Sequence, residues 1–339
     1  MTDTTDRPLV SFAVIAYNQE RYIREAIEGA FAQTYEPLEI ILSDDCSPDR
    51  TFDIMQEMAA AYDGPHKVVL NRNEPNLGIV PHVNRIFDLA SGELICVNAG
   101  DDFSRHDRVE VLHRHWVIND RRPDIVHTSA YDVSEKSEIM RVAQPRPNSR
   151  ARVLLPKTVA REFVTAIGAT FMYTKRLFLT FGPIPDCAEV EDRPMIFRAS
   201  LAGGLLFVDD PLVYHRVGGA SFAKTEEKDK QSLFGDRIKF RSWRVSSARC
   251  YLKDIAVCEF NCEDIDQEYL RHFIRENEWE TDLYRSSFLG RLMMMPEAFA
   301  RSYRNRSFRP LKSYVKYLAW PVYPVHLYLK NKLQKTSTD

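Results

Sequence analysis

The segments VSFAVIAYN (residues 10–18) and EIILSDDCS (residues 39–47) decide the fold of this chain. Each starts with a run of β-prone apolar residues, so we predict strands over Val10–Ala16 and Glu39–Leu42. The residues between them, Glu20–Gln33, carry the apolar spacing of a helix. A strand, a helix and a second strand in this order form a β-α-β unit, in which the two strands lie parallel.

The same alternation continues to residue 98, with predicted helices and strands in turn over Thr51–Tyr62, Lys67–Leu70, Val80–Ala90 and Glu93–Asn98. Strands that alternate with helices indicate an α/β fold with a mostly parallel, doubly wound sheet. Ligands of such sheets bind beyond the carboxyl ends of the strands, where helix N-termini present free N–H groups. We therefore expect the functional site at those strand ends.

The pattern is less regular in the rest of the chain. We predict a helix, a strand, an irregular loop over the site and two short strands, over Asp107–Asp120, Ile125–Ser129, Glu135–Ala151 and within Ala199–Val208 and Leu212–His215. Beyond Phe222 glycine becomes rare, and helices are predicted over Glu226–Phe260 and Gln267–Met294. The expected organisation is an α/β domain over residues 1–222 and a helical region over residues 223–339.

The composition is that of a globular protein, with 44% hydrophobic and 28% charged residues among 339, a length that favours two domains. The formal net charge of −2 gives no electrostatic reason to expect a nucleic-acid partner. Residues 1–8 lack the apolar stretch of a secretory signal, and no segment reaches the roughly 18 uninterrupted apolar residues of a membrane span. We expect a cytoplasmic protein.

The cysteines are scattered along the chain. None forms a C-x-x-C pair, and none has a histidine nearby at the spacing of a zinc site. We interpret all six as reduced thiols: Cys46, Cys96, Cys187, Cys250, Cys258 and Cys262.

Polar clusters follow three of the predicted strands, and they are Tyr17-Asn18, Ser43-Asp44-Asp45 and Gly100-Asp101-Asp102. Carboxylates at a strand end can hold a hard cation together with diphosphate oxygens, and this makes Asp101 and Asp102 the strongest chemical indication in the sequence. Asp44 and Asp45 can hydrogen-bond to the base and ribose of a nucleoside. Acids and hydroxyls at strand ends also cap helices, so a purely structural role stays open for these groups.

Three later clusters also fit either a functional or a structural role. Glu191-Asp192 lies among other acids, which raise the proton affinity that a general base needs, but acids also favour the start of a helix. His215-Arg216 can supply a cation to a diphosphate or serve the fold. Asn76-Leu77-Gly78 can bring backbone N–H groups to a phosphate or form a simple turn.

Taken in order, these clusters resemble the family-two glycosyltransferases. The resemblance covers residues 8 to about 222 and rests on the segments at 10–18 and 39–47, with QTY at 33–35, SGELI at 91–95 and Asp101-Asp102. It implies an A-type glycosyltransferase fold, Rossmann-like with a mostly parallel central sheet, that binds a nucleotide diphosphate sugar. It also implies Mg²⁺ or Mn²⁺ as cofactor and a direct displacement that inverts the anomeric carbon.

The resemblance also implies a role for individual residues. Asp101 takes the place of the last acid of the D-x-D motif and Asp102 the next position, which makes both the expected metal ligands. Asp192 falls where the family carries its catalytic base, and Glu191 completes that acidic pair. The residues assigned to the donor are Ala16, Tyr17, Asn18, Asp44, Asp45, Asn76, Gly78, Asp101 and Arg216.

The chain departs from the family pattern at three places. Ala99 replaces the usual first acid of the D-x-D motif, which leaves one metal contact fewer, and Ile15 replaces a common proline. A histidine often stands two positions after an arginine in the later motif, whereas here Gly218 follows Arg216 at that spacing and His215 precedes it. A histidine metal ligand is therefore not predicted.

The end of the chain is basic and aromatic, with no acid between Glu297 and Asp339. This composition is typical of a segment at a bilayer interface, although Pro321 and Pro324 interrupt any long helix, and a helix docked on the α/β domain is the alternative. The basic and aromatic residues are Arg301, Arg304, Arg306, Arg309, Lys312, Tyr314, Lys316, Tyr317, Trp320, Tyr323, Tyr328, Lys330, Lys332 and Lys335.

The expected function is transfer of a sugar from a UDP- or dTDP-linked donor to a hydroxyl of a glycan or lipid-linked acceptor in bacterial polysaccharide biosynthesis, at the cytoplasmic face of the membrane. One alternative is a transferase for a soluble acceptor, with the tail as the interface of a homodimer. A nucleotidyltransferase is another, but it usually needs a glycine-rich basic loop where this chain has Tyr17-Asn18-Gln19-Glu20. A non-catalytic nucleotide-sugar-binding module is the third.

Overall fold

The structure is a computed structural model that describes residues 7–150, 154–217, 230–305 and 307–318 of the chain. It divides into two compact units. The first comprises residues 1–225 and 249–267, and the second comprises residues 226–248 and 268–339. The domain end predicted near Phe222 lies outside the described residues and stays a prediction.

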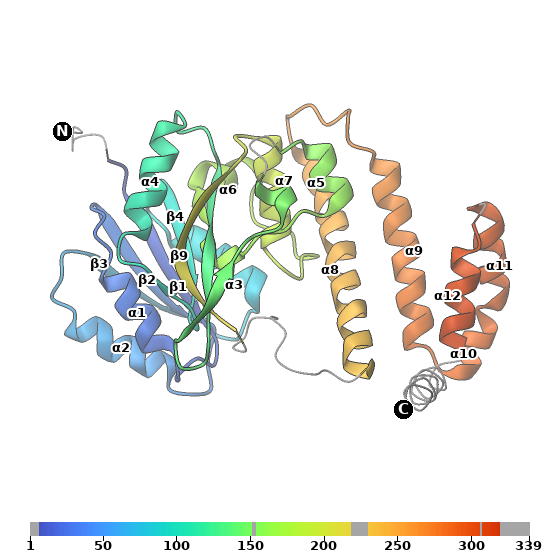
Figure 1. Cartoon of the computed structure of the whole chain (residues 1–339), viewed down its shortest axis with the longest axis horizontal. Helices are drawn as coiled ribbons and strands as arrows, with labels where there is room; N and C mark the ends of the chain where they lie inside the picture. Colours follow the sequence, from blue (N-terminus) through green and yellow to red (C-terminus); the bar gives the residue numbers. More distant parts are fainter. Residues whose placement is uncertain (1–6, 151–153, 218–229, 306, 319–339) are drawn as a thin grey trace, which may run out of the picture. The chain divides into compact units, whose positions relative to one another are not determined.

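The first unit is built on a nine-stranded sheet with the order β3-β2-β1-β4-β8-β6-β9-β5, in which β7 pairs with β6. Figure 1 labels β1, β2, β3, β4 and β9 of this sheet. One half of the sheet is parallel and consists of β1 (Val10–Ala16), β2 (Leu38–Asp44), β3 (Lys67–Arg72) and β4 (Leu94–Ala99). Ala16 pairs with Asp44 of β2, and Ile15 pairs with Ala99 of β4. The carboxyl ends of β1, β2 and β4 therefore meet, and the predicted α/β fold is confirmed.

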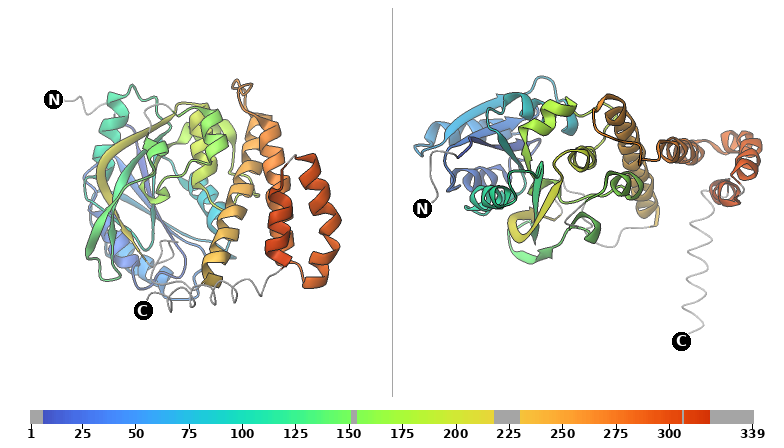
Figure 2. Two further views of the ribbon diagram at one scale, coloured as in Figure 1. Left: turned by 45° about the vertical axis from the view of Figure 1, so that its right-hand side comes forward. Right: turned by 90° about the horizontal axis from the view of Figure 1, so that it is seen from above.

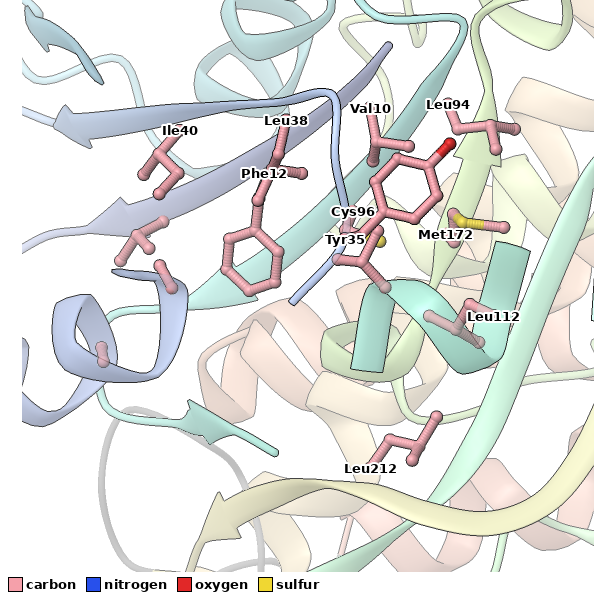
Figure 3. Packing of buried hydrophobic residues seen from close by; sticks show 14 of the residues in the cluster. Val10, Phe12, Tyr35, Leu38, Ile40, Leu94, Cys96, Leu112, Met172 and Leu212 are labelled. Atoms are coloured by element: carbon pink, nitrogen blue, oxygen red, sulfur yellow. The ribbon is translucent and has the colours of Figure 1, made fainter. Parts of the chain in front are cut away.

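Helices connect these strands and cover the sheet. They are α1 (Ile23–Phe31), α2 (Thr51–Ala61) and α3 (Ile79–Leu89). Every second residue of β1 faces a hydrophobic core shared with α1, α2 and α4 (Arg108–Ile118). Figure 3 shows Phe12, Cys96 and Leu112 in this core. Because β1 and β2 are buried along their whole length and β4 along all but its last residue, the loops at the ends of these three strands are the part available for a ligand.

The other half of the sheet is mixed. It contains β8 (Met172–Thr174), which is antiparallel to both β4 and β6 (Ile125–Val133), and β9 (Leu205–Arg216), which is parallel to β6. The short β5 (Phe103–Ser104) closes the order by pairing with β9. This half brings the last residues of β9 back to the loop that follows β4.

Two predictions for this half are wrong. The stretch Glu135–Ala151, predicted as a loop, contains β7 (Ile139–Ala143) and the 3-10 turn η2 (Pro147–Arg150), while Ala151 lies outside the described residues. β7 is exposed and is fixed by pairing with β6, so its sequence carries no strong apolar pattern. The two short strands predicted within Ala199–Val208 and Leu212–His215 are one strand, β9, which continues through its polar centre with a shift of register.

The remaining elements of the first unit precede β9. They are α5 (Pro156–Glu162), the 3-10 turn η3 (Gly168–Thr170), α6 (Lys175–Phe181) and α7 (Asp192–Leu201). The last part of α8 (Lys230–Val257) also belongs to this unit, since residues 249–267 are part of it. There Asp254 forms a buried ion pair with Arg198 of α7, with Oδ1 accepting from Nη2 at 2.9 Å.

The second unit is helical and includes the start of α8. Its other helices are α9 (Gln267–Arg285), α10 (Phe288–Met293), α11 (Met295–Arg304) and α12 (Arg309–Leu318), drawn in orange to red in Figure 2. The single helix predicted over Gln267–Met294 is wrong at its end, because α9 stops at Arg285 and the Ser287 hydroxyl caps a new helix. A small core holds the unit together and contains Ile238, Trp279, Leu283, Ala298 and Tyr314.

Candidate active site

A cavity of about 270 Å³ lies at the carboxyl ends of β1, β2 and β4. Its wall comes from the three strand ends and from the start of α3, as the order of the sheet requires. The lining residues are Ile15, Ala16, Tyr17, Gln19, Asp45, Asn76, Gly78, Ile79, His82, Ala99, Gly100 and Asp101. Several residues predicted to bind a donor are thus brought together: Ala16, Tyr17, Asp45, Asn76, Gly78 and Asp101.

Asp45, at the end of β2, is held by a ring of hydrogen bonds. Its Oδ1 accepts from the backbone N–H of Leu77 and from Asn73 Nδ2, both at 2.9 Å, and its Oδ2 accepts from the backbone N–H of Gly78 at 2.8 Å. Gly78 has φ +81°, a left-handed conformation that favours glycine. Asn76 Nδ2 donates to the Asp45 carbonyl at 2.8 Å, so the Asn76-Gly78 turn is fastened to this one acid.

Asp44 and Asn18, also assigned to the donor, do not line the cavity. Asp44 is fully buried and accepts hydrogen bonds from the backbone N–H and the hydroxyl of Ser47. Asn18 has φ +58°, and its backbone N–H donates to the same Ser47 hydroxyl at 2.8 Å. In this structure both residues shape the turns that carry Tyr17 and Asp45.

The end of β4 forms a tight turn that carries Asp101 and Asp102. Gly100 approaches β1 so closely that an added Cβ would lie 2.7 Å from the Cβ of Ala16. Buried Asn98 closes the turn, with Nδ2 donating to the carbonyls of Ala99 and Asp102, each at 2.8 Å. The close approach places Asp101 in the cavity wall and Asp102 behind it.

Asp102 is almost completely buried, and its Oδ1 accepts from the backbone N–H of Arg216 at 2.8 Å. Burial raises the pKa of this carboxyl to about 7, and the neighbouring charge of Asp101 acts in the same direction. Two adjacent acids that repel each other in this way favour a cation beside them. Among the described residues, however, no group of three or more acids, histidines or cysteines is placed to hold a metal ion.

Arg216, predicted to bind the diphosphate, is directed elsewhere in this structure. Its side chain is only 1% exposed and is absent from the cavity wall. The guanidinium donates to the carboxylate of Glu25 and to the carbonyls of Asp101 and Ser134, and it stacks on Tyr22 at 4.3 Å. Arg216 therefore supports the Asp101-Asp102 turn from behind.

His215, the neighbour of Arg216, also has a protein partner. Its Nδ1 lies 3.0 Å from Oδ1 of Asp132, on the paired strand β6. Gly218, whose position in the family motif often carries histidine, lies outside the described residues.

The predicted base, Asp192, is the first residue of α7, and Glu191 is the residue before it. Both side chains are partly buried. The hydroxyl of Thr165 donates to Oδ2 of Asp192 at 2.5 Å, and an added Cβ on Gly168 would lie 3.0 Å from Oε1 of Glu191. Burial and then the charge of Asp192 raise the pKa of Glu191 to about 7. A carboxyl with a raised pKa is suited to acid–base chemistry, but neither acid lines the cavity at the strand ends.

Sequence reasoning missed His82, which lines the cavity from the first turns of α3. Its Nε2 lies 2.7 Å from the Ser43 hydroxyl, and burial lowers its pKa, so it is neutral at pH 7. Gln19 and Ile79 were missed as well. The available signal was position, since Ile79 and His82 lie one helical turn apart directly after Gly78.

The sequence profile of glycosyl transferase family 2 matches residues 11–181. Among relatives, EpsH of Bacillus subtilis (strain 168), which is named as a glycosyltransferase, is 28% identical over 295 residues, covering 84% of this chain and 81% of its own. The first three relatives, uncharacterized mycobacterial proteins, are 39% identical over 95 residues, and the chain covers only 27% of their length.

Two solved structures share the fold. Staphylococcus aureus TarS 1-349 in complex with UDP-GlcNAc has a TM-score of 0.54 and 16% identity, covering 82% of this chain and 73% of its own. The mannosyltransferase PcManGT from Pyrobaculum calidifontis, in complex with GDP-Man and Mn²⁺, has a TM-score of 0.56 and 16% identity, covering 98% and 89%. With the profile match over half of its residues, this chain belongs to glycosyl transferase family 2.

Proposed function

We propose that this protein is an inverting glycosyltransferase that moves a sugar from a UDP- or dTDP-linked donor to a hydroxyl of a glycan or lipid-linked acceptor in bacterial polysaccharide biosynthesis. The observation that carries the proposal is the cavity between the ends of β1, β2 and β4, with Asp45 and Asp101 in its wall. A nucleotide-sugar donor agrees with the names of the structural neighbours, which bind UDP-GlcNAc and GDP-Man.

The hydrogen bonds of Asp45 support its role in the nucleoside pocket. Its carboxylate fixes the Asn76-Gly78 turn in the wall of the cavity, and Tyr17, half exposed, lines the same cavity. An exposed aromatic ring is suited to stacking on a base. We assign the nucleoside to the part of the cavity lined by Asp45 and Tyr17, and the diphosphate to the part lined by Asp101.

The acids at the end of β4 fit a divalent cation. Their oxygens are the ligands that Mg²⁺ and Mn²⁺ prefer, and Mg²⁺ is commonly bound by one or two carboxylates together with substrate phosphates. The raised pKa of Asp102 reflects burial beside Asp101, which a cation would relieve. Asp101 and Asp102 would hold this ion, and when bound it would neutralise the charge of the departing diphosphate.

The acceptor side is assigned to Glu191 and Asp192. Asp192 takes the proton of the acceptor hydroxyl as its oxygen attacks the anomeric carbon, while the bond to the nucleoside diphosphate breaks on the opposite face. The hydrogen bond from Thr165 orients the Asp192 carboxylate for this transfer. Glu191, whose pKa is raised by burial and by the charge of Asp192, is the second carboxyl of this acidic pair.

Donor binding is tested by thermal shift on the full chain. UDP, dTDP, GDP, ADP and the corresponding sugars are compared with and without Mn²⁺, because a ligand that binds the folded state raises the melting temperature by mass action. We expect one base to give a shift that depends on Mn²⁺. Asp45→Asn should weaken the shift, whereas the control Asp53→Asn, an exposed acid of α2, should retain it. No shift with any nucleotide would contradict the proposal.

Catalysis is tested with Asp192→Asn and with water as the probe acceptor. Loss of a general base costs about 10² to 10⁴ in rate. Release of nucleoside diphosphate should fall by at least about 100-fold while the donor-induced thermal shift stays. Asp186→Asn, an exposed acid in the same region, is the matched control. Donor binding by a wild-type protein that releases no diphosphate would instead support a non-catalytic binding module.

We also propose that the second unit contacts an anionic bilayer, which would bring the site to a lipid-linked acceptor at the cytoplasmic face. α10 and α11 expose apolar side chains at helical spacing, including Leu289 (73% exposed) and Met293 (83%). From residue 286 to residue 318 the sequence has one acid, Glu297, among many arginines and lysines. Apolar groups bordered by cations match an anionic lipid surface.

The part of the chain that the structure describes contains no helix that could span a bilayer. The aromatic tail residues from Trp320 onward, with Arg306, lie outside the described residues, and nothing is described of the Tyr317 side chain. The surface of α10 and α11 is therefore the part of the contact that can be tested by design.

Vesicle flotation with anionic and neutral lipid tests this contact. Leu289→Glu should reduce recovery with anionic vesicles, whereas Leu179→Glu, at a leucine of α6 that is 72% exposed, should not. Equal recovery of both variants would contradict the membrane proposal. A wild-type dimer that Leu289→Glu dissociates would support the alternative, in which this surface is a homodimer interface and the acceptor is soluble.

A further inference from the structure

Two cysteines from distant parts of the sequence meet beside the segment that leads to Asp192. Cys187 lies between α6 and α7, and Cys250 lies in the part of α8 that belongs to the first unit. Their Sγ atoms are 3.2 Å apart, and both are free thiols. A disulfide bond is about 2.05 Å long, so the sulfurs need to approach by only about 1 Å to be joined.

The two thiols have different environments, which gives them different roles. Cys187 is partly exposed, and the hydrogen bond from Cys250 lowers its pKa to about 6, with Lys253 and Arg249 acting in the same direction. Cys250 is completely buried, and its hydrogen bond to Cys187 together with burial raises its pKa. An accessible thiolate beside a buried thiol is the arrangement of an attacking and a resolving cysteine.

We propose that Cys187 and Cys250 form an oxidation site at which a peroxide converts the two thiols into a disulfide. The Cys187 thiolate attacks one oxygen of hydrogen peroxide, the O–O bond breaks, and a sulfenic acid and hydroxide form. The Cys250 sulfur then attacks the Cys187 sulfur and displaces the hydroxyl group, which leaves as water after taking up a proton. The two sulfurs lose two electrons, and one peroxide becomes two waters.

The disulfide would attach the segment 183–191 covalently to α8. This segment is already tied to α3 by two hydrogen bonds between the side chain of Asn84 and the backbone of Ile184, at 2.8 and 3.0 Å. α7 is already tied to α8 by the ion pair of Arg198 with Asp254. The bond would therefore restrict the segment between two fixed points rather than move α7.

The consequence for activity rests on the proposed function. Because the segment 183–191 ends directly before the predicted base, Asp192, its restriction should act on the acceptor side of the reaction. We expect oxidation to change the KM for the acceptor, or the rate of hydrolysis with water, and to leave the thermal shift by the donor nucleotide unchanged.

A second cysteine pair provides an internal control. Cys258 and Cys262 have their Sγ atoms 3.3 Å apart, nearly the same distance as the first pair. Burial and the hydrogen bond with Cys258 raise the pKa of Cys262 to about 12. Proximity alone would oxidise both pairs at similar rates, whereas an activated thiolate favours the first pair.

The test uses the full-length protein, treated with hydrogen peroxide for increasing times, then alkylated with iodoacetamide, digested and analysed by mass spectrometry without reduction. We expect a peptide bridged through Cys187 and Cys250 that dithiothreitol removes, formed at least about tenfold faster than any bridge between Cys258 and Cys262. Cys258→Ser/Cys262→Ser should leave this reaction intact. Cys187→Ser should abolish it.

Three outcomes would overturn the proposal: Cys187 remains fully alkylated after peroxide, Cys187 is oxidised without a bridge to Cys250, or the control pair reacts as fast. Because the readout is a covalent bond, it does not depend on catalytic activity. A bridge that forms in a protein without transferase activity would leave the oxidation site standing and contradict only the proposed function.

Discussion

The ends of β2 and β4 both present two consecutive acids, but the structure treats the two pairs differently. At β2 each acid has several hydrogen-bond donors, with Ser47 serving Asp44 and the Asn76-Gly78 turn serving Asp45. At β4 the pair lies in a tight turn, and burial with mutual repulsion raises the pKa of Asp102 to about 7. In both pairs one acid lines the cavity and the other is buried beside it.

We expect this difference to give two kinds of binding site within one cavity. A carboxylate whose oxygens already accept from backbone N–H groups is a rigid structural acceptor, with its charge largely compensated. A buried pair of acids whose charges repel each other has affinity for a cation or for protons. We therefore expect the β2 end to determine the shape of the nucleoside pocket and the β4 end to determine its dependence on metal.

The largest expected effect is on turnover. Asp101→Asn should reduce nucleoside diphosphate release by about 100-fold or more, because it removes a carboxylate from the predicted cation site at the diphosphate. Asp45→Asn should weaken donor binding and keep the Mn²⁺ dependence. The measurement is a Mn²⁺ titration of turnover for both variants, with Asp53→Asn as control. Equal Mn²⁺ dependence in the two variants would break the distinction between the strand ends.

The second largest effect is on the free energy of unfolding, and we expect it at the end of β2. Asp45→Ala leaves the N–H groups of Leu77 and Gly78 without their acceptor, and we expect a loss of about 3 kcal/mol in the free energy of unfolding. Asn76→Ala, which removes one hydrogen bond to the same turn, should cost about 1 kcal/mol. Urea unfolding measures both. A loss in Asp101→Ala as large as that in Asp45→Ala would mean that both ends are structural.

Much of the fold could be predicted because it is recorded locally in the sequence. The predicted Val10–Ala16 coincides with β1, and Thr51–Tyr62 differs from α2 by one residue, since apolar periodicity follows directly from burial. β7 could not be predicted, because an exposed strand depends on its partner rather than on its own side chains. The register that continues β9 through Pro211 is likewise a property of the pairing with β6.

The residues of the candidate site also divide into those that local sequence predicts and those that depend on contacts with distant parts of the chain. Asp45 and Asp101 follow strands directly, so the ends of a parallel sheet bring them together without further information. Arg216 and His82 depend on long-range geometry. The guanidinium of Arg216 finds its partners in Glu25 and in the loop after β6, at sequence distances that no local pattern records. His82 is identified only when α3 is placed against the cavity.

A third pair of consecutive acids, Glu191-Asp192, can be compared with the other two through the pH dependence of stability. The pKa of Glu191 rises from an ordinary 4.5 to about 7 through burial and Asp192, so between these pH values the folded state binds a proton that the unfolded state has lost. Stability due to this group therefore falls as pH rises from 4.5 to 7. Glu191→Gln removes the cost of ionising this carboxyl in the folded state. It should raise the free energy of unfolding by about 2 kcal/mol at pH 8, a value reduced to allow for the partial exposure of the side chain.

Thermal unfolding of Glu191→Gln and wild type at pH 5 and pH 8 measures this gain. The advantage of the variant should be small at pH 5 and full at pH 8. Glu189→Gln, an exposed acid two residues away, is the matched control and should show no comparable trend. A gain in melting temperature that does not depend on pH would mean that burial and the neighbouring acid do not raise the pKa of Glu191 as they raise that of Asp102.

The smallest expected effect, a coupling free energy of about 1 kcal/mol, separates the two strand ends by their glycines. Gly100→Ala should cost about 1 to 3 kcal/mol, because the new Cβ would meet the Cβ of Ala16 at 2.7 Å. Gly78→Ala should cost a similar amount for another reason, since its φ of +81° is strained for alanine although nothing lies within 4 Å. Ala16→Gly should relieve the first variant by about 1 kcal/mol and leave the second unchanged. Urea unfolding of the two double-mutant cycles therefore distinguishes a steric clash at Gly100 from backbone strain at Gly78. Equal coupling of Ala16 to both glycines would show that the two strand ends are not independent.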